Sequence, residues 1–171
     1  MRELEASLIG QVSALHEITS QCGVMLRHVK PHGALYNAAA DDWNLAVAIA
    51  RSVAVVDRNL VLVGLAGSSA LEVWRDRGFS VVAEAFADRR YEPNGTLRSR
   101  AFPGALIDNP GEAAKQALLI ARDGIVACVD GRTIPISAQT ICIHGDALNA
   151  TLIADAVRQT LTLSGVVVKP F

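Results

Sequence analysis

The chain has 171 residues, of which 51% are hydrophobic and 19% are charged. Its 16 lysines and arginines and 17 aspartates and glutamates leave a formal net charge of −1. There is therefore no basic field to attract nucleic acid or an anionic membrane surface, and no apolar run reaches the ~20 residues of a membrane-spanning helix. The same composition excludes disorder, collagen and coiled coil, and the length favours a single domain over residues 1–171.

The three cysteines, Cys22, Cys128 and Cys142, are few and widely spaced. An odd number without close spacing argues against a disulfide framework and against a zinc knuckle. The first ten residues carry Glu3 and Glu5 and lack the basic start and apolar run of a signal peptide. We therefore expect three buried, reduced thiols in a cytoplasmic protein.

Hydrophobic periodicity and turn residues define the expected secondary structure. In chain order the elements are a helix over residues 2–22, a strand over 25–29, a helix from 41 or 42 to 56, a strand over 60–63, a helix over 69–77, a strand over 80–86, a long loop over 87–110, a helix from 110 or 111 to 122, a hairpin of strands 125–129 and 132–136, a strand over 140–144 and a helix over 147–163. Asp130 and Gly131 are a two-residue hairpin signal. The long loop is rich in arginine and proline, and a loop of this length is usually functional or mobile.

The alternation of strands and helices predicts an α/β fold with a parallel sheet and right-handed crossovers. The strands are largely apolar, as expected when both faces of a sheet are covered. In such folds, ligands bind beyond the carboxyl ends of the strands. Polar side chains follow four separate strands at this edge, which predicts one concavity lined by Lys30, His32, Glu84, Asp88 and His144.

Each of these residues also has a purely structural interpretation. Lys30 alone could be an exposed strand-end lysine, and His32 could satisfy a turn. Asp146 could cap the last helix, a role that aspartate favours. The segment from Gly64 to Ser69 could be only a tight turn, since it lacks the full phosphate-binding fingerprints. Glu84 is harder to explain structurally, because a buried carboxylate needs a partner.

Three blocks carry a resemblance to a known family. The blocks are VKPHGALYN at residues 29–37, EAFADRRY at 84–91 and TICIHGD at 140–146. Their order and spacing resemble the LamB/YcsF lactam-utilisation family, which supplies the A subunit of ATP-dependent 5-oxoprolinase. The resemblance covers nearly the whole chain from about residue 5, and three long blocks in one order are a specific signal.

The resemblance implies a parallel-stranded irregular (β/α) barrel of the glycoside hydrolase and deacetylase type. Family members usually carry further N-terminal blocks, which are absent here, so the chain resembles the C-terminal two-thirds of such a barrel and is expected to be incomplete at the N-terminus. An open sheet edge normally drives association. We therefore expect self-association as a homo-oligomer, or binding to the missing segment or to a partner subunit.

The implied activity is a hydrolase that opens 5-oxo-L-proline to L-glutamate with ATP as co-substrate, in a complex with subunits B and C. Lys30 and Arg89 would then stabilise a phosphorylated lactam oxygen. Glu84, His144 and Asp146 are candidates for the general base, and His32 could hydrogen-bond the amide or donate to the leaving nitrogen. The expected site residues are, as catalytic groups, Lys30, His32, Glu84, Asp88, His144 and Asp146, and, as substrate or nucleotide contacts, Tyr36, Asn37, Gly67, Ser68 and Arg89.

The resemblance also allows a bound divalent metal, whose ligands the sequence leaves unknown. Two other functions stay open at this point. The chain could be a metal-dependent, deacetylase-like hydrolase that uses His and Asp ligands, or a non-catalytic remnant or assembly subunit. Neither nucleic acid nor a membrane is expected as a partner.

Overall fold

The computed structural model describes residues 1–171 and divides them into two compact units, Met1–Ala83 and Glu84–Phe171. The strand β3, Val81–Phe86, begins in the first unit and ends in the second. The expectation of a single domain over the whole chain stays a prediction. None of the helices is long and apolar enough to cross a lipid bilayer.

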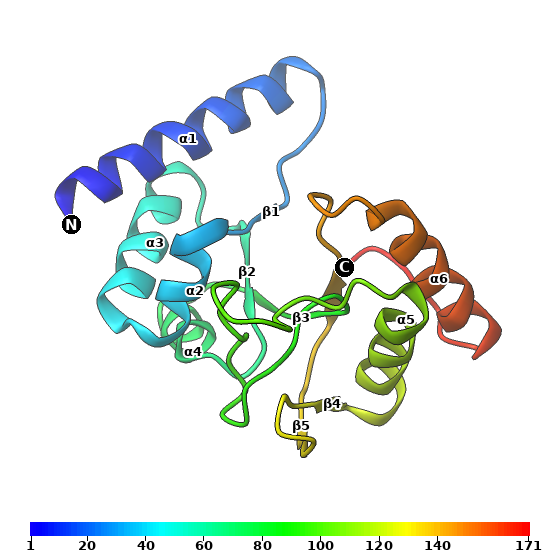
Figure 1. Cartoon of the computed structure of the whole chain (residues 1–171). Helices are drawn as coiled ribbons and strands as arrows, with labels where there is room; N and C mark the ends of the chain where they lie inside the picture. Colours follow the sequence, from blue (N-terminus) through cyan, green and yellow to red (C-terminus); the bar gives the residue numbers. More distant parts are fainter. The chain divides into compact units, whose positions relative to one another are not determined.

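Most of the elements predicted for residues 1–83 are present in the first unit, close to their expected bounds. It comprises α1 Arg2–Gln21, β1 His28–Val29, α2 Gly33–Asp41, α3 Trp43–Val56, β2 Val61–Leu65 and α4 Ser69–Asp76. The strands β1 and β2 are parallel, with His28 opposite Val61. The helix α1 lies along α3 (Figure 1), and this packing buries Val12.

The start of α3 and its attachment to α4 are both explained by side-chain hydrogen bonds. The side chain of Asp42 accepts hydrogen bonds from the backbone N–H groups of Asn44 and Leu45, as expected of a helix N-cap. The helix is anchored to α4 by Trp74, whose indole Nε1 donates to the carbonyl of Ala46 at 2.9 Å. Trp74 is 1% exposed and packs against Gly64 in β2, so the absence of a side chain at Gly64 makes room for the indole.

The first unit differs from the expectations at two points. Residues 33–41, for which no helix or strand was predicted, form the helix α2, which begins at Gly33 directly after Pro31 and His32. Gly33 has a φ of +61°, which glycine adopts without strain. Cys22 is exposed rather than buried, because it lies at the end of α1, beyond the part of the helix packed on α3. Cys128 is buried, Cys142 is half-buried, and all three thiols are free, as expected.

The second unit is built around the end of β3. The other elements are α5 Pro110–Leu118, a π-helical turn Leu119–Asp123, β4 Ile125–Ala127, β5 Thr133–Pro135, β6 Thr140–Cys142 and α6 Ala150–Leu163. The predicted hairpin is confirmed, since β4 and β5 are antiparallel. The strands β3 and β6 are parallel, with Glu84 opposite Thr140 and Phe86 opposite Cys142, so both segments leave the pair in the same direction.

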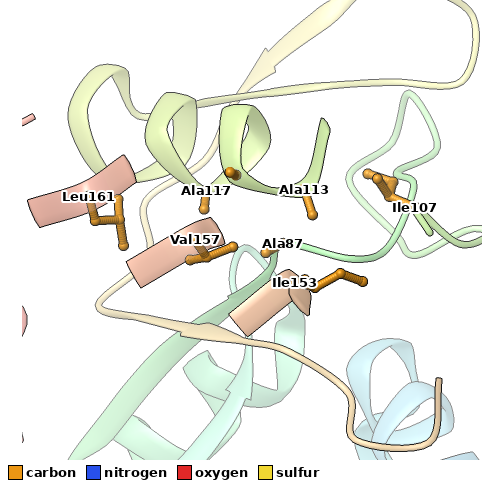
Figure 2. Packing of buried hydrophobic residues seen from close by; sticks show 8 residues of the cluster. Ala87, Ile107, Ala113, Ala117, Ile153, Val157 and Leu161 are labelled. Atoms are coloured by element: carbon orange, nitrogen blue, oxygen red, sulfur yellow. The ribbon is translucent and has the colours of Figure 1, made fainter. Parts of the chain in front are cut away.

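The core of this unit lies between α5, α6 and the segment that follows β3. Figure 2 shows Ala113 and Ala117 of α5 facing Ile153 and Val157 of α6, with Ala87 between the helices. The small alanine side chains allow the two helices to approach closely, and Ala87 is fully buried against them. The helix pair therefore fixes the backbone at the point where the chain leaves β3.

Candidate functional site

The carboxyl ends of the two parallel strands β3 and β6 bring Asp88 and His144 together. The backbone N–H of His144 donates to Oδ2 of Asp88 at 2.7 Å, and the ring nitrogen Nδ1 lies 3.0 Å from both carboxylate oxygens. Asp88 is 5% exposed, whereas the His144 side chain is 19% exposed. Both residues were predicted for the site from the sequence, and a carboxylate paired with an imidazole is suited to general acid–base chemistry.

The pair favours an ionised carboxylate. Burial raises the pKa of Asp88, but the hydrogen bonds from the His144 ring and backbone outweigh burial and bring the pKa below its usual value of 3.8. An ionised Asp88 carboxylate can only accept hydrogen bonds, so it favours the His144 tautomer in which Nδ1 carries the hydrogen and Nε2 is the acceptor nitrogen. The ring of Phe86 stacks on His144 with centroids 5.4 Å apart and an interplanar angle of 19°, so the imidazole is fixed on two sides.

A shallow pocket opens next to this pair. Its polar lining consists of Asp88, Arg100, Asp108, His144 and Asp146, and its apolar lining consists of Leu106, Ile107, Ala147 and Ile153. Arg100, which lies in the long loop, forms an ion pair with Asp146 at 2.7 Å, and both side chains are exposed. The hydrogen bond from Arg100 lowers the pKa of Asp146, and the same bond raises the pKa of Arg100.

The interpretation of Asp146 as the cap of the last helix is wrong. The helix α6 begins at Ala150, later than predicted, and Asn149 occupies the N-cap position. The side chain of Asn149 is instead hydrogen-bonded to the carbonyl of Asp108. Asp146 is therefore free of a structural role in the helix and lies in the pocket with Arg100.

Arg89 and Glu84 are both buried in the second unit. The Nη2 of Arg89 donates to the carbonyl of Arg98 at 2.6 Å, while its Nε has no hydrogen-bond partner. Burial lowers the pKa of Arg89, and the neighbouring charge of Arg100 lowers it further. Glu84 is 5% exposed on β3. It precedes Phe86 by two residues and therefore lies on the same face of the strand, the face that Phe86 uses to contact His144.

The remaining predicted residues belong to the first unit. The Lys30 ammonium lies 5.5 Å from the ring centroid of Tyr36 in a cation–π contact. His32 and Asn37 are exposed, and Asn37 donates to the carbonyl of Gly33.

Two more predicted residues precede α4. Gly67 has a φ of +80°, and the hydroxyl of Ser68 is buried without a hydrogen-bond partner. The expectation that the residues of the first unit line one concavity with Glu84, Asp88 and His144 stays a prediction.

Three residues that sequence analysis missed contribute to this region. Arg100 faces the pocket, Tyr91 accepts a hydrogen bond from the backbone N–H of Phe86 at 2.8 Å, and Gln116 donates to the backbone after β3. The arginine-rich composition of the long loop was the available signal for Arg100. Nothing in the sequence distinguishes Gln116 from a solvent-facing helical glutamine.

A metal site is not supported by the donors present. No group of three or more His, Cys, Asp or Glu side chains that could hold a metal ion occurs in the structure. The Asp88 carboxylate is already engaged by His144, and the Asp146 carboxylate is engaged by Arg100. We therefore assign no ligand set to a metal.

Comparison with known proteins identifies close relatives along the whole chain. A model of the LamB/YcsF family matches residues 1–171. Proteins named as the A subunit of 5-oxoprolinase are 50% identical in Chloroflexus aggregans and 52% identical in Chloroflexus aurantiacus, each over 98% of this chain. A crystal structure of a lactam utilization protein from Thermus thermophilus has a TM-score of 0.91 and 42% identity and covers 99% of this chain.

The chain spans about two thirds of the length of these relatives. It covers 66% of each Chloroflexus protein and 68% of the Thermus thermophilus chain. The structural likeness confirms the predicted α/β fold with parallel strands and is consistent with the predicted barrel.

Proposed function

The chain belongs to the LamB/YcsF family, and from this premise we propose that it acts as the A subunit of a 5-oxoprolinase, a hydrolase that opens the cyclic amide of 5-oxo-L-proline to give L-glutamate. The observation that carries the proposal is the identity of about half of all residues, over 98% of the chain, to proteins of that name. ATP as co-substrate and subunits B and C as partners are part of the same proposal, as is a cytoplasmic location.

The proposed base is His144. Ring opening needs a water molecule whose oxygen adds to the lactam carbonyl carbon, and a nearby base must take a proton from it. The ionised Asp88 holds Nδ1 in its protonated form, so that Nε2 accepts the proton. The imidazolium then donates that proton to the ring nitrogen as the carbon–nitrogen bond breaks. Asp88 stabilises the positive charge that His144 carries between the two steps.

Arg100 is the proposed contact for the substrate carboxylate. 5-Oxoproline carries one carboxylate next to its ring nitrogen, and a guanidinium binds such a group with two parallel hydrogen bonds. Arg100 lies in the same pocket as His144, and its ion pair with Asp146 is exposed to solvent. An exposed pair of this kind is worth little by itself, so a carboxylate can compete with Asp146 for the guanidinium.

The other predicted residues keep proposed roles near the reacting amide. Opening an unstrained lactam is thermodynamically unfavourable, which is why coupling to phosphoryl transfer from ATP is part of the proposal. In this scheme the γ-phosphoryl group of ATP is transferred to the lactam oxygen and ADP leaves. Water addition and cleavage of the carbon–nitrogen bond then give an acyl phosphate, which a second water hydrolyses to glutamate and inorganic phosphate. Lys30 is the proposed cation for the phosphorylated oxygen, with Arg89 as a second cation and His32 as a hydrogen-bond donor. Glu84 and Asp146 remain candidates for a second proton acceptor. Tyr36, Asn37, Gly67 and Ser68 are proposed contacts for substrate or nucleotide.

Reconstitution tests the proposal directly. The chain is mixed with 5-oxoprolinase subunits B and C of a relative, and L-glutamate and ADP are measured after addition of 5-oxo-L-proline and ATP. We expect both products in equal amounts, and only when the chain and both subunits are present. Absence of glutamate, in an assay where the relative's own A subunit is active, would contradict the proposed function.

Substitution of two histidines separates the proposed site from general damage. His144→Gln should lower the rate by roughly 10²–10⁴, the usual contribution of a general base. His16→Gln is the matched control, because His16 lies on α1, a helix that carries none of the proposed site residues, and this variant should keep the parent rate. Equal rates for both variants would remove His144 from the mechanism.

A further inference from the structure

We propose that Gln116 of α5 is a positioning residue, which holds Asp88 in register with His144. The proposal rests on the proposed roles of these two residues and adds a residue that has no other assigned function. Gln116 is 5% exposed. Its amide nitrogen Nε2 lies 2.8 Å from the carbonyl oxygen of Phe86, 3.2 Å from that of Ala87 and 2.8 Å from that of Arg89.

The three carbonyl groups lie on both sides of Asp88 in the chain. The side-chain amide of Gln116 has two N–H bonds, and these are shared among three carbonyl oxygens. The backbone after β3 must therefore curve around the amide group to bring all three carbonyls within hydrogen-bonding distance. The other buried residues of α5 are Ala113, Ala114 and Ala117, which are small and apolar. Gln116 is therefore the one polar residue on the buried face of α5. Burying an amide is costly unless it is hydrogen-bonded, and the carbonyls of the curved backbone after β3 provide those hydrogen bonds.

The remaining backbone contacts of this segment leave little freedom. The N–H of Phe86 donates to the hydroxyl of Tyr91 at 2.8 Å, and the N–H of Ala87 donates to the carbonyl of Cys142 at 3.1 Å. The carbonyl of Asp88 accepts from the N–H of Ile107 at 2.9 Å. Gln116 donates to the carbonyls of Phe86, Ala87 and Arg89, so its hydrogen bonds lie on both sides of Asp88.

The hydrogen bonds between Asp88 and His144 depend on the hydrogen bonds that Gln116 makes to the backbone, because both sets are sensitive to geometry. The carboxylate accepts from the His144 backbone N–H at 2.7 Å and faces the ring at 3.0 Å, and such bonds weaken steeply when the angle or distance changes. Without the amide, the buried carbonyls must turn toward other donors or water, since an unsatisfied buried acceptor is costly. That turn moves the backbone of Asp88 and loosens both bonds to His144.

Hydrogen exchange of the His144 backbone amide reports on this placement without any measurement of activity. The variant Gln116→Met keeps the length of the side chain and removes both donors. We expect the His144 amide to exchange roughly ten- to a hundredfold faster than in the parent chain, after normalisation to the amides of β4. The measurement uses the full chain at neutral pH and two-dimensional NMR.

Two further variants separate positioning from loss of stability. Val126→Ala removes packing from β4, where Val126 is fully buried, and makes no change to the hydrogen bonds of Gln116. This variant should change the exchange of all core amides by one common factor. Gln116→Asn keeps the amide but is one methylene shorter, and we expect an intermediate loss of His144 protection. If Gln116→Met does not fold, the result for Gln116→Asn decides.

The proposal is overturned if the His144 amide in the Gln116 variants follows the same common factor as in Val126→Ala. In the reconstituted complex, Gln116→Met should lower kcat for glutamate formation and leave KM unchanged, because Gln116 does not contact substrate. If the complex makes no glutamate at all while the exchange results are as expected, the proposed function fails and the positioning role of Gln116 stands.

Discussion

The contact between Asp88 and His144 predicts a measurable loss of stability in Asp88→Asn. The carboxylate accepts two hydrogen bonds from His144, at 2.7 and 3.0 Å. Charge-assisted bonds contribute ~1.5–3 kcal/mol each and neutral ones ~0.5–1.5 kcal/mol. The asparagine keeps one acceptor for the backbone N–H and loses its charge, and its NH₂ group forces the imidazole into the other tautomer. We expect the free energy of unfolding to fall by about 2–3 kcal/mol at pH 7.

The same variant has a characteristic dependence on pH. The hydrogen bonds from His144 hold the pKa of Asp88 below its usual value, so the carboxylate contributes stability that is fully present above the pKa of the unfolded chain, ~3.9. This contribution is lost as the pH falls through the lower pKa of the folded state. The difference between the parent and Asp88→Asn should therefore shrink as the pH falls below about 4.

Urea unfolding followed by far-ultraviolet circular dichroism measures both effects. Both tryptophans, Trp43 and Trp74, lie in the first unit, so their fluorescence would report mainly on the wrong unit. Asp155→Asn, an exposed substitution on α6, is the control and should stay within ~0.5 kcal/mol of the parent. If Asp88→Asn unfolds at the same urea concentration as Asp155→Asn at pH 7, the pair makes no net contribution and the reasoning is refuted.

Three other substitutions test separate parts of the structure. Gly64→Ala would place a Cβ 2.7 Å from the Trp74 ring, and we expect a loss of ~1–3 kcal/mol in urea unfolding; an unchanged midpoint would mean that the indole moves freely. Tyr91→Phe leaves the buried N–H of Phe86 without its acceptor, which should cost ~1–3 kcal/mol by the same measurement, and a loss below ~0.5 kcal/mol would indicate a replacement acceptor. Arg100→Gln should raise KM for 5-oxoproline in the reconstituted complex by roughly tenfold or more if the guanidinium binds the carboxylate, and a normal KM would exclude that contact.

Residues with local signals were predicted well from the sequence. Asp42 caps α3 because aspartate directly before an apolar helix favours that position. Asp130 and Gly131 join β4 and β5 because this dipeptide suits a hairpin turn. Asp88 and His144 were expected together because each follows a strand of a parallel sheet, and parallel strands carry their ends to one edge.

Residues whose role depends on distant partners were not predictable in this way. The helix α2 was missed because Pro31 and Gly33 are usually read as turn residues, whereas here Gly33 starts a helix. The ion pair of Asp146 with Arg100 was not predicted, because the two residues are 46 positions apart in the chain. Gln116 was overlooked because its three acceptors are 27 to 30 positions distant, and no local pattern reveals such contacts.

A double-mutant cycle on glutamate formation tests most directly whether Asp88 acts through His144. The rates of Asp88→Asn, His144→Gln and the double variant are compared with the parent chain in the complex with subunits B and C. If the two residues form one acid–base unit, the double variant is as slow as His144→Gln alone, because Asp88 has nothing left to orient. Losses that multiply in the double variant, or a His144→Gln variant as fast as the parent, would contradict the account.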